Sequence, residues 1–195
     1  LLKKSEGIAA ALLTECDDLR EARVAFMVSP GIDYVAVQWG IWRAGGIAVP
    51  LCITYPLPSL AYVIEDTQAE FLIASPEYVS IIVTDSIEKN GKKGGTSLPE
   101  IDKERGAMIL YTSGTTSLPK GVLTTHAIIE SQIKTLVDAW NWSSEDHILE
   151  ILPLHHVHGI INVLCCALWS GATVQFINPF QAKEVFRIFQ EEKLN

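Results

Sequence analysis

The sequence predicts an α/β fold, with a mainly parallel sheet and helices on both faces. Short runs of apolar and β-branched residues alternate along the chain with stretches of helical length. Hydrophobic residues make up 48% of the 195 residues and charged residues 19%, the balance of a globular chain with a buried core. Because parallel strands are joined by crossover helices, this alternation is typical of a sheet covered on both sides.

Turn signals divide the first part of the chain into alternating elements. A Ser-Pro-Gly turn ends the first apolar run, and Gly45-Gly46 stops the helix that follows it. The predicted elements, in order, are helix 1–13, strand 23–28, helix 33–42, strand 46–51, helix 58–67, strand 70–74 and helix 77–84.

Residues 86–105 are charged, rich in Gly and poor in apolar side chains, so we expect a surface loop within the domain. The predicted elements after it are strand 107–111, helix 125–140, strand 147–152, helix 157–169, strand 173–177 and helix 182–192. Ligands of such sheets bind at the carboxyl ends of the strands. The polar segments that follow strands 107–111 and 147–152 are therefore the candidate site.

Composition and charge exclude several classes of function. The formal net charge is −8, and no cluster of Lys and Arg exceeds a pair, which argues against a nucleic-acid partner. No apolar run approaches the roughly 18 residues of a membrane span, and no signal-peptide pattern is present. We expect the four cysteines to be reduced and the protein to be intracellular. They are Cys16, Cys52, Cys165 and Cys166.

Residues 111–121, here called the hydroxyl-rich loop, read Tyr-Thr-Ser-Gly-Thr-Thr-Ser-Leu-Pro-Lys-Gly. Hydroxyls donate to phosphate oxygens, Gly114 permits close backbone approach, and Lys120 adds a positive charge. The alternative is an ordinary Ser/Thr/Gly surface loop, but this loop directly follows a buried strand and ends in Pro-Lys-Gly. A Walker A loop would end in Gly-Lys-Ser/Thr, so the P-loop NTPase interpretation fails.

The hydroxyl-rich loop resembles the signature loop of the adenylate-forming superfamily, Tyr/Phe-Thr-Ser-Gly-Ser/Thr-Thr-Gly-x-Pro-Lys-Gly. Ten of eleven positions match or are free, and Ser117 stands where the family has Gly. If that position needs a positive φ, Ser costs on the order of 1 kcal/mol. The segment 41–51 resembles the family's Ala-Gly-Gly segment, to which we assign a structural role only.

Residues 152–159 (Leu-Pro-Leu-His-His-Val-His-Gly) resemble the family segment at the acyl pocket, and His156 matches the position beside the activated carboxylate. A zinc site at His155, His156 and His158 is the alternative, but the segment itself has no Cys or carboxylate to complete it. We therefore predict no metal ligands and assign His155 and His158 to packing or a backbone hydrogen bond. Together, the segments from Arg105 to Gly171 are most similar to malonyl-CoA synthetases.

The resemblance implies two reactions: a carboxylate attacks Mg-ATP to form an acyl-adenylate, and CoA then forms the thioester. It implies catalytic roles for Lys120 and His156, an acid such as malonate or methylmalonate as small-molecule partner, and ATP, Mg²⁺ and CoA as cofactors. It also implies the mitochondrial matrix, and it leaves the oligomeric state open. The nucleotide-binding residues it implies are Thr112, Ser113, Gly114, Thr115, Thr116, Ser117, Leu118, Pro119 and Lys120.

We interpret residues 1–195 as a partial N-terminal AMP-binding domain without the C-terminal domain. The family's Tyr-Gly-x-Thr-Glu segment and late catalytic Lys have no match here, so we expect this chain alone to be inactive. Two alternatives remain: a truncated, non-catalytic paralogue with a nucleotide-binding or interaction role, and an adenylating enzyme for another acid, such as a fatty acid.

Overall fold

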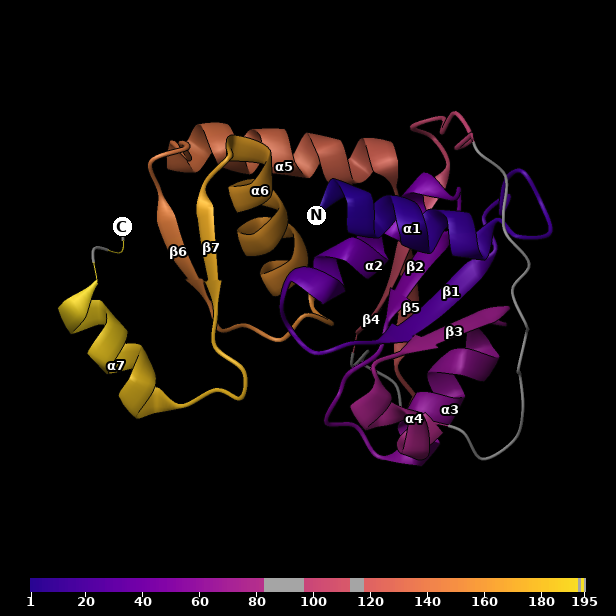
Figure 1. Cartoon of the computed structure of the whole chain (residues 1–195), viewed down its shortest axis with the longest axis horizontal. Coiled ribbons are helices and arrows are strands. Elements are labelled where there is room, and N and C mark those ends of the chain that lie inside the picture. Colours follow the sequence, from indigo (N-terminus) through magenta and orange to yellow (C-terminus); the bar gives the residue numbers. More distant parts are fainter. Residues whose placement is uncertain (83–96, 113–117, 193, 195) are drawn as a thin grey trace. The chain divides into compact units, whose positions relative to one another are not determined.

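The computed structural model describes residues 1–82, 97–112, 118–192 and 194, and the chain divides into two compact units, Leu1–His126 and Ala127–Asn195 (Figure 1). The predicted fold class is confirmed: strands and helices alternate, and the main sheet is mostly parallel. Most of the predicted surface loop at 86–105 lies outside the described residues, and 99–105 contain no helix or strand.

The first unit is built on a five-stranded sheet with the strand order β3-β1-β2-β4-β5. Strands β1 to β4 are parallel, and β5 runs antiparallel to β4 at the edge. The carboxyl ends of β1 to β4 therefore meet at one edge of the sheet. The strands are β1 Arg23–Met27, β2 Ile47–Pro50, β3 Phe71–Ala74, β4 Gly106–Thr112 and β5 Lys120–Thr125.

Helices cover both faces of this sheet. Side chains alternate along β1, so successive residues pack against the helices on opposite faces. On one face, Ala25 and Met27 pack against Leu60 and Val63. On the other, the ring of Phe26 lies 5.1 Å from that of Tyr34. Each such large side chain contributes roughly 1.5–3 kcal/mol when buried. The helices are α1 Leu2–Leu12, α2 Ile32–Arg43, α3 Leu57–Asp66 and α4 Pro76–Ile82 (Figure 1).

Strand β5 is an element that the sequence pattern does not predict. All four residues from Lys120 to Leu123 are exposed, so the strand lacks the buried alternation by which strands are recognised. It forms because the outer edge of β4 offers backbone donors and acceptors. Strand β5 pairs with this edge along the length of β4, from Gly106 to Thr112. The hydroxyl-rich loop thus connects two hydrogen-bonded strands.

Gly45 and Gly46 have the structural role that we predict for them. The N–H of Gly45 donates to the Trp42 carbonyl and that of Gly46 to the Ile41 carbonyl, both at 3.0 Å. This is the pattern of a Schellman helix end, in which the first residue beyond the helix is left-handed. The φ of Gly45 is 80°, which only glycine adopts without strain.

The second unit contains a two-stranded parallel sheet, β6 His147–Glu150 and β7 Thr173–Phe176. Leu149 packs against Val185 and Ile188 of α7 Ala182–Glu191. The long helix α5 His126–Trp140 is joined to the next helix by a 2.7 Å hydrogen bond from Gln132 to Asn162. The predicted helix 157–169 is composite: η1 His158–Cys165 is a π-helix, and α6 Cys166–Ser170 continues it.

None of the described helices combines the length and the hydrophobicity needed to cross a membrane. All four cysteines fall within the described residues and are free; Cys16 is exposed and the other three are buried.

Candidate functional site: the two ends of the hydroxyl-rich loop and the histidine segment

Thr112 and Lys120 lie opposite each other where the hydroxyl-rich loop leaves and rejoins the sheet. They are the last residue of β4 and the first of β5, and they are register partners across the antiparallel pair. Directly opposed side chains have Cβ atoms about 5 Å apart. Both residues are exposed. The Lys120 ammonium has no ion-pair partner among the described residues, so a hydroxyl and an available cation stand together.

The central residues that we predict to bind phosphate, Ser113 to Ser117, lie outside the described residues. Leu118 is described and is 57% exposed, and Pro119 is half-buried. Four of the nine predicted nucleotide-binding residues, Thr112, Leu118, Pro119 and Lys120, are therefore located at the carboxyl edge of the parallel strands, where ligands of α/β sheets bind.

Helix α3 contacts both strands next to the loop. The Tyr62 hydroxyl donates to the Pro119 carbonyl at 2.9 Å, and the Tyr111 hydroxyl donates to Asp66 Oδ2 at 2.5 Å. The two tyrosine rings meet edge to face, with centroids 6.1 Å apart. Burial raises the pKa of Tyr111, and its hydrogen bond to Asp66 raises it further, so the phenol stays protonated. Neither Tyr62 nor Asp66 belongs to a sequence motif, although their four-residue spacing places them on one helix face.

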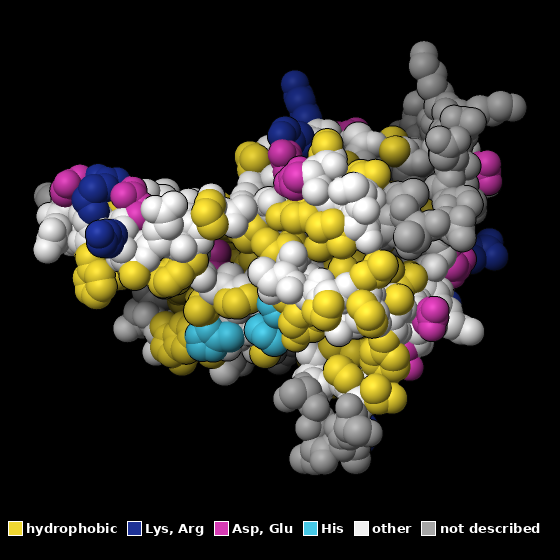
Figure 2. Space-filling view, turned by 90° about the horizontal axis from the view of Figure 1, so that it is seen from below, with side chains coloured by type: hydrophobic (Ala, Val, Ile, Leu, Met, Phe, Trp, Pro, Cys, Tyr) yellow, Lys and Arg dark blue, Asp and Glu magenta, His cyan; other side chains and the backbone are white. Residues whose placement is uncertain are grey.

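His156 lies in the turn that follows β6, in the second unit, and its side chain is exposed. Its backbone N–H donates to the Pro153 carbonyl at 3.3 Å, and its carbonyl accepts from the Ile160 N–H at 3.1 Å. The rings of His155 and His156 have centroids 4.1 Å apart. Burial, assisted by His156, lowers the pKa of His155 to about 4. His155 is therefore neutral near pH 7. Figure 2 shows histidine side chains at the molecular surface.

Gly159 allows the π-helix to approach the Leu-Pro segment that leads to His156. A Cβ atom at position 159 would lie 2.8 Å from the Pro153 carbonyl oxygen and 3.1 Å from the Leu152 Cβ atom. The first of these contacts is shorter than real Cβ atoms show, and the partner is backbone. Backbone packing at Gly159 therefore determines the path of residues 153–156.

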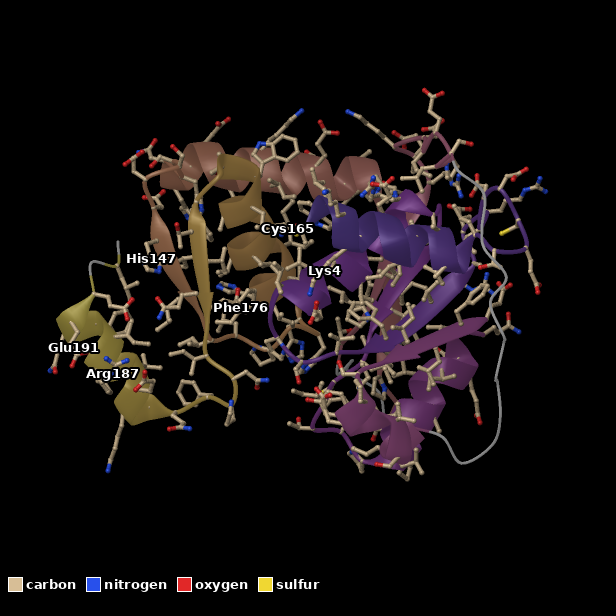
Figure 3. All side chains as sticks on the ribbon, viewed as in Figure 1. Lys4, His147, Cys165, Phe176, Arg187 and Glu191 are labelled. Atoms are coloured by element: carbon tan, nitrogen blue, oxygen red, sulfur yellow. The ribbon has the colours of Figure 1, made fainter. Side chains whose placement is uncertain are left out.

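Glu150, the last residue of β6, is a buried carboxylic acid beside this segment. Its side chain is 1% exposed, and Oε1 accepts a 2.8 Å hydrogen bond from the Leu152 N–H. Burial raises its pKa to about 7. Its charge also contributes to raising the pKa of buried Cys165 to about 12, after burial itself and Cys166. Figure 3 labels Cys165 on the helix next to the β6–β7 sheet. The sequence analysis assigns no role to Glu150, because a single carboxylate in an apolar strand carries no motif.

The structure thus brings Thr112, Pro119 and Lys120 together, whereas His156 belongs to the other compact unit. Within the part of the chain that is described, no three His, Cys, Asp or Glu side chains are grouped as a metal would require. Both predicted segments do follow the carboxyl end of a strand, β4 and β6.

Comparisons with known proteins show the family to which the chain belongs. The family model described as AMP-binding enzyme matches residues 1–195. Human mitochondrial malonate–CoA ligase ACSF3 is 40% identical over 188 residues, covering 88% of this chain and 33% of that protein. Malonate–CoA ligase of Arabidopsis thaliana is 32% identical over 211 residues, covering 97% and 33%. ATP-bound MatB of Rhodopseudomonas palustris shares the fold, with a TM-score of 0.80 at 23% identity, over 98% of this chain and 42% of that one.

The chain therefore belongs to the AMP-binding enzyme family, part of the adenylate-forming superfamily that the loop motif indicates. Within that family it is similar to malonate–CoA ligases, and it spans about a third of the length of these curated relatives. The resemblance to malonyl-CoA synthetases predicted from the sequence is confirmed.

Proposed function

We propose that the protein to which this chain belongs activates a carboxylic acid with ATP and then transfers the acyl group to CoA. The proposed acid is malonate or methylmalonate. The observation that carries the proposal is the pairing of Thr112 with Lys120, which places a hydroxyl and an ammonium without an ion-pair partner among the described residues at the two ends of the loop. The names of the relatives, malonate–CoA ligases, support the choice of acid.

The proposed roles follow from charge. The chain carries a net charge of −8, so ATP must be held by local groups rather than by a general positive field. Lys120 neutralises charge on the β- and γ-phosphates, and Thr112 donates from its hydroxyl, together with backbone and hydroxyl groups of Ser113 to Ser117. Preorganised donors of this kind stabilise the charge that develops at the phosphate during attack. Mg²⁺ enters with the nucleotide.

His156 is proposed to orient the carboxylate of the acid. An exposed imidazole on a segment fixed by backbone contacts at Pro153 and Gly159 can donate a hydrogen bond without reorganising. Lys120 and His156 are thus proposed as the catalytic residues for the two reactants, nucleotide and acid. The location proposed is the mitochondrial matrix, supported by the names of the animal relatives.

Ser117 favours a second candidate, a paralogue that binds nucleotide or a partner without catalysis. It replaces a Gly of the family motif, and an L-residue forced to a positive φ there would distort the loop.

The deciding experiment is carboxylate-dependent exchange between ATP and pyrophosphate, measured on the longest native product of the gene. Malonate, methylmalonate, acetate and a long-chain acid are compared. Exchange that depends on malonate or methylmalonate supports the ligase. Exchange with the long-chain acid alone would reassign the substrate, and folded protein that exchanges with none of them would establish the non-catalytic alternative.

A further inference from the structure

One face of α3 forms a hydrogen bond near each end of the hydroxyl-rich loop, at Tyr111 and at Pro119. Tyr111 directly precedes Thr112, and its hydroxyl donates to Asp66 at 2.5 Å. Pro119 directly precedes Lys120, and its carbonyl accepts from Tyr62 at 2.9 Å. Tyr62 and Asp66 are four residues apart in the same helix, so they project from the same side.

The two hydrogen bonds belong to one packed cluster. The rings of Tyr62 and Tyr111 contact each other at an interplanar angle of 80°, and both pack against the core formed by Ala25, Val49 and Leu60. Edge-to-face aromatic pairs of this kind add about 0.5–1.5 kcal/mol beyond burial. The rings therefore contribute to the packing between α3 and the sheet, and this contact does not require the hydroxyls.

The hydroxyls have a separate consequence for Lys120. Pro119 has no N–H, so at this residue the backbone can be held only through its carbonyl. The Tyr62 hydroxyl supplies that contact, one residue before the ammonium that the proposed function assigns to phosphate. On the opposite strand, Asp66 holds Tyr111 one residue before Thr112.

We propose that Tyr62 and Asp66 are positioning residues for nucleotide binding, and that they hold Thr112 and Lys120 opposite each other before ATP arrives. This role rests on the proposed function of the loop. Neither side chain touches the nucleotide: Tyr62 acts through the Pro119 carbonyl and Asp66 through the Tyr111 hydroxyl. Preorganisation of this kind lowers the cost of fixing Thr112 and Lys120 in position on binding.

The first test compares Tyr62→Phe with Tyr78→Phe in the longest native product. Phe keeps the ring and removes only the hydroxyl. Tyr78 is the matched control, because its ring packs against the same core while its hydroxyl bonds Ser29 at 2.7 Å, away from the loop. In ATP–pyrophosphate exchange, Tyr62→Phe should raise the KM for ATP about five-fold, the effect of losing one neutral hydrogen bond. The KM for the acid should stay unchanged, and Tyr78→Phe should resemble the wild type.

The second test is hydrogen exchange without ligands, which does not depend on activity. In Tyr62→Phe, the amides of Lys120 and Gly121 should exchange about five-fold faster, while those of β1 stay as slow as before. Asp66→Ala should have the same effect on these amides by releasing Tyr111.

The two readouts separate the two proposals. If the wild-type protein shows no ATP–pyrophosphate exchange with any of the acids, the proposed function is contradicted. The amide comparison then decides whether α3 holds the residues at the ends of the loop. If the wild type is active and Tyr62→Phe and Tyr78→Phe have the same KM for ATP, the positioning role is overturned. This holds whatever the amide exchange rates are.

Discussion

Arg105 binds Asp18 through two hydrogen bonds, of 2.7 and 2.8 Å, and donates a third, of 2.7 Å, to the carbonyl of Gly45. One guanidinium thus joins the segment before β1, the end of α2 and the residue before β4. The pair is mostly shielded from solvent, with side chains 19% and 26% exposed. The hydrogen bond from Arg105 lowers the pKa of Asp18, so the carboxylate is charged in the folded state.

Replacing Arg105 by Lys should lower the free energy of unfolding of the first unit by about 1–3 kcal/mol, because an ammonium lacks the planar fork for all three contacts. The difference in unfolding free energy between wild type and variant should be full above the pKa of Asp18 in the unfolded chain, near 3.8. It should shrink as pH falls through the lower pKa that Asp18 has in the folded protein. Urea unfolding at several pH values measures it. Arg187→Lys is the control: Arg187 pairs with Glu184 and Glu191 in the open on α7 (Figure 3), so no measurable change is expected.

Lys120→Ala in the full-length protein should slow adenylation about a hundred-fold and leave the KM for the acid within two-fold. Under the proposed function, the ammonium acts on phosphate charge that grows during attack, and it does not contact the acid. Pyrophosphate exchange at varied acid concentration gives both values. Lys4→Ala removes another exposed lysine, which pairs with Asp33, and it should have no effect (Figure 3). An unchanged rate for Lys120→Ala would remove it from the catalytic set.

His156→Ala should reduce the rate with malonate or methylmalonate at least ten-fold, because an oriented hydrogen-bond donor to the carboxylate is lost. His158→Ala, two residues further on and equally exposed, is the matched control and should retain activity. Circular dichroism should show both variants folded, since the segment is held by its backbone. Equal losses in the two variants would contradict the specific role of His156.

Glu150 makes the stability of the second unit depend on pH. Its pKa of about 7 lies above its ordinary 4.5, so the folded state favours the protonated acid. The stability contributed by that form is full below about pH 4.5 and is lost as pH rises through 7, up to about 3 kcal/mol. His155, whose pKa is lowered to about 4, contributes a slope of opposite sign, so the Glu150 contribution is measured as the difference in unfolding free energy between wild type and Glu150→Gln at several pH values. That difference should change between about pH 4.5 and 7, whereas Glu145→Gln, at an exposed carboxylate, should follow the wild type. A difference that is constant with pH would contradict the raised pKa of Glu150.

Much of the fold follows from local patterns. Apolar runs such as 23–28 predict strands because both faces of a parallel sheet are buried, and Gly45 predicts a helix end because of its backbone freedom. Strand β5 does not follow, because its side chains are exposed and its pairing depends on the edge of β4. The π-helical stretch of η1 cannot be predicted from local patterns either. An apolar helical run has the same sequence pattern whether its backbone hydrogen bonds are those of an α-helix or of a π-helix.

The site divides in the same way. The loop motif predicts binding roles for Thr112 and Lys120 because their chemistry is local, and the structure adds that they are register partners. Tyr62 and Asp66 could be recognised only through contacts with residues about 45 to 57 positions away, which no local pattern encodes. Glu150 is similar, since its significance arises from burial rather than from its neighbours in sequence.

The close approach of Gly159 to Pro153 has a consequence for how this segment can evolve. Position 159 tolerates no side chain without moving the backbone, whereas position 156 is exposed and adds nothing to that packing. Substitutions at 156 should therefore cost little folding free energy beyond the ring contact with His155, and under the proposed role of His156 they would change the preference for the acid. A saturation library at position 156 would test that role through substrate preference, while one at 159 should yield destabilised variants.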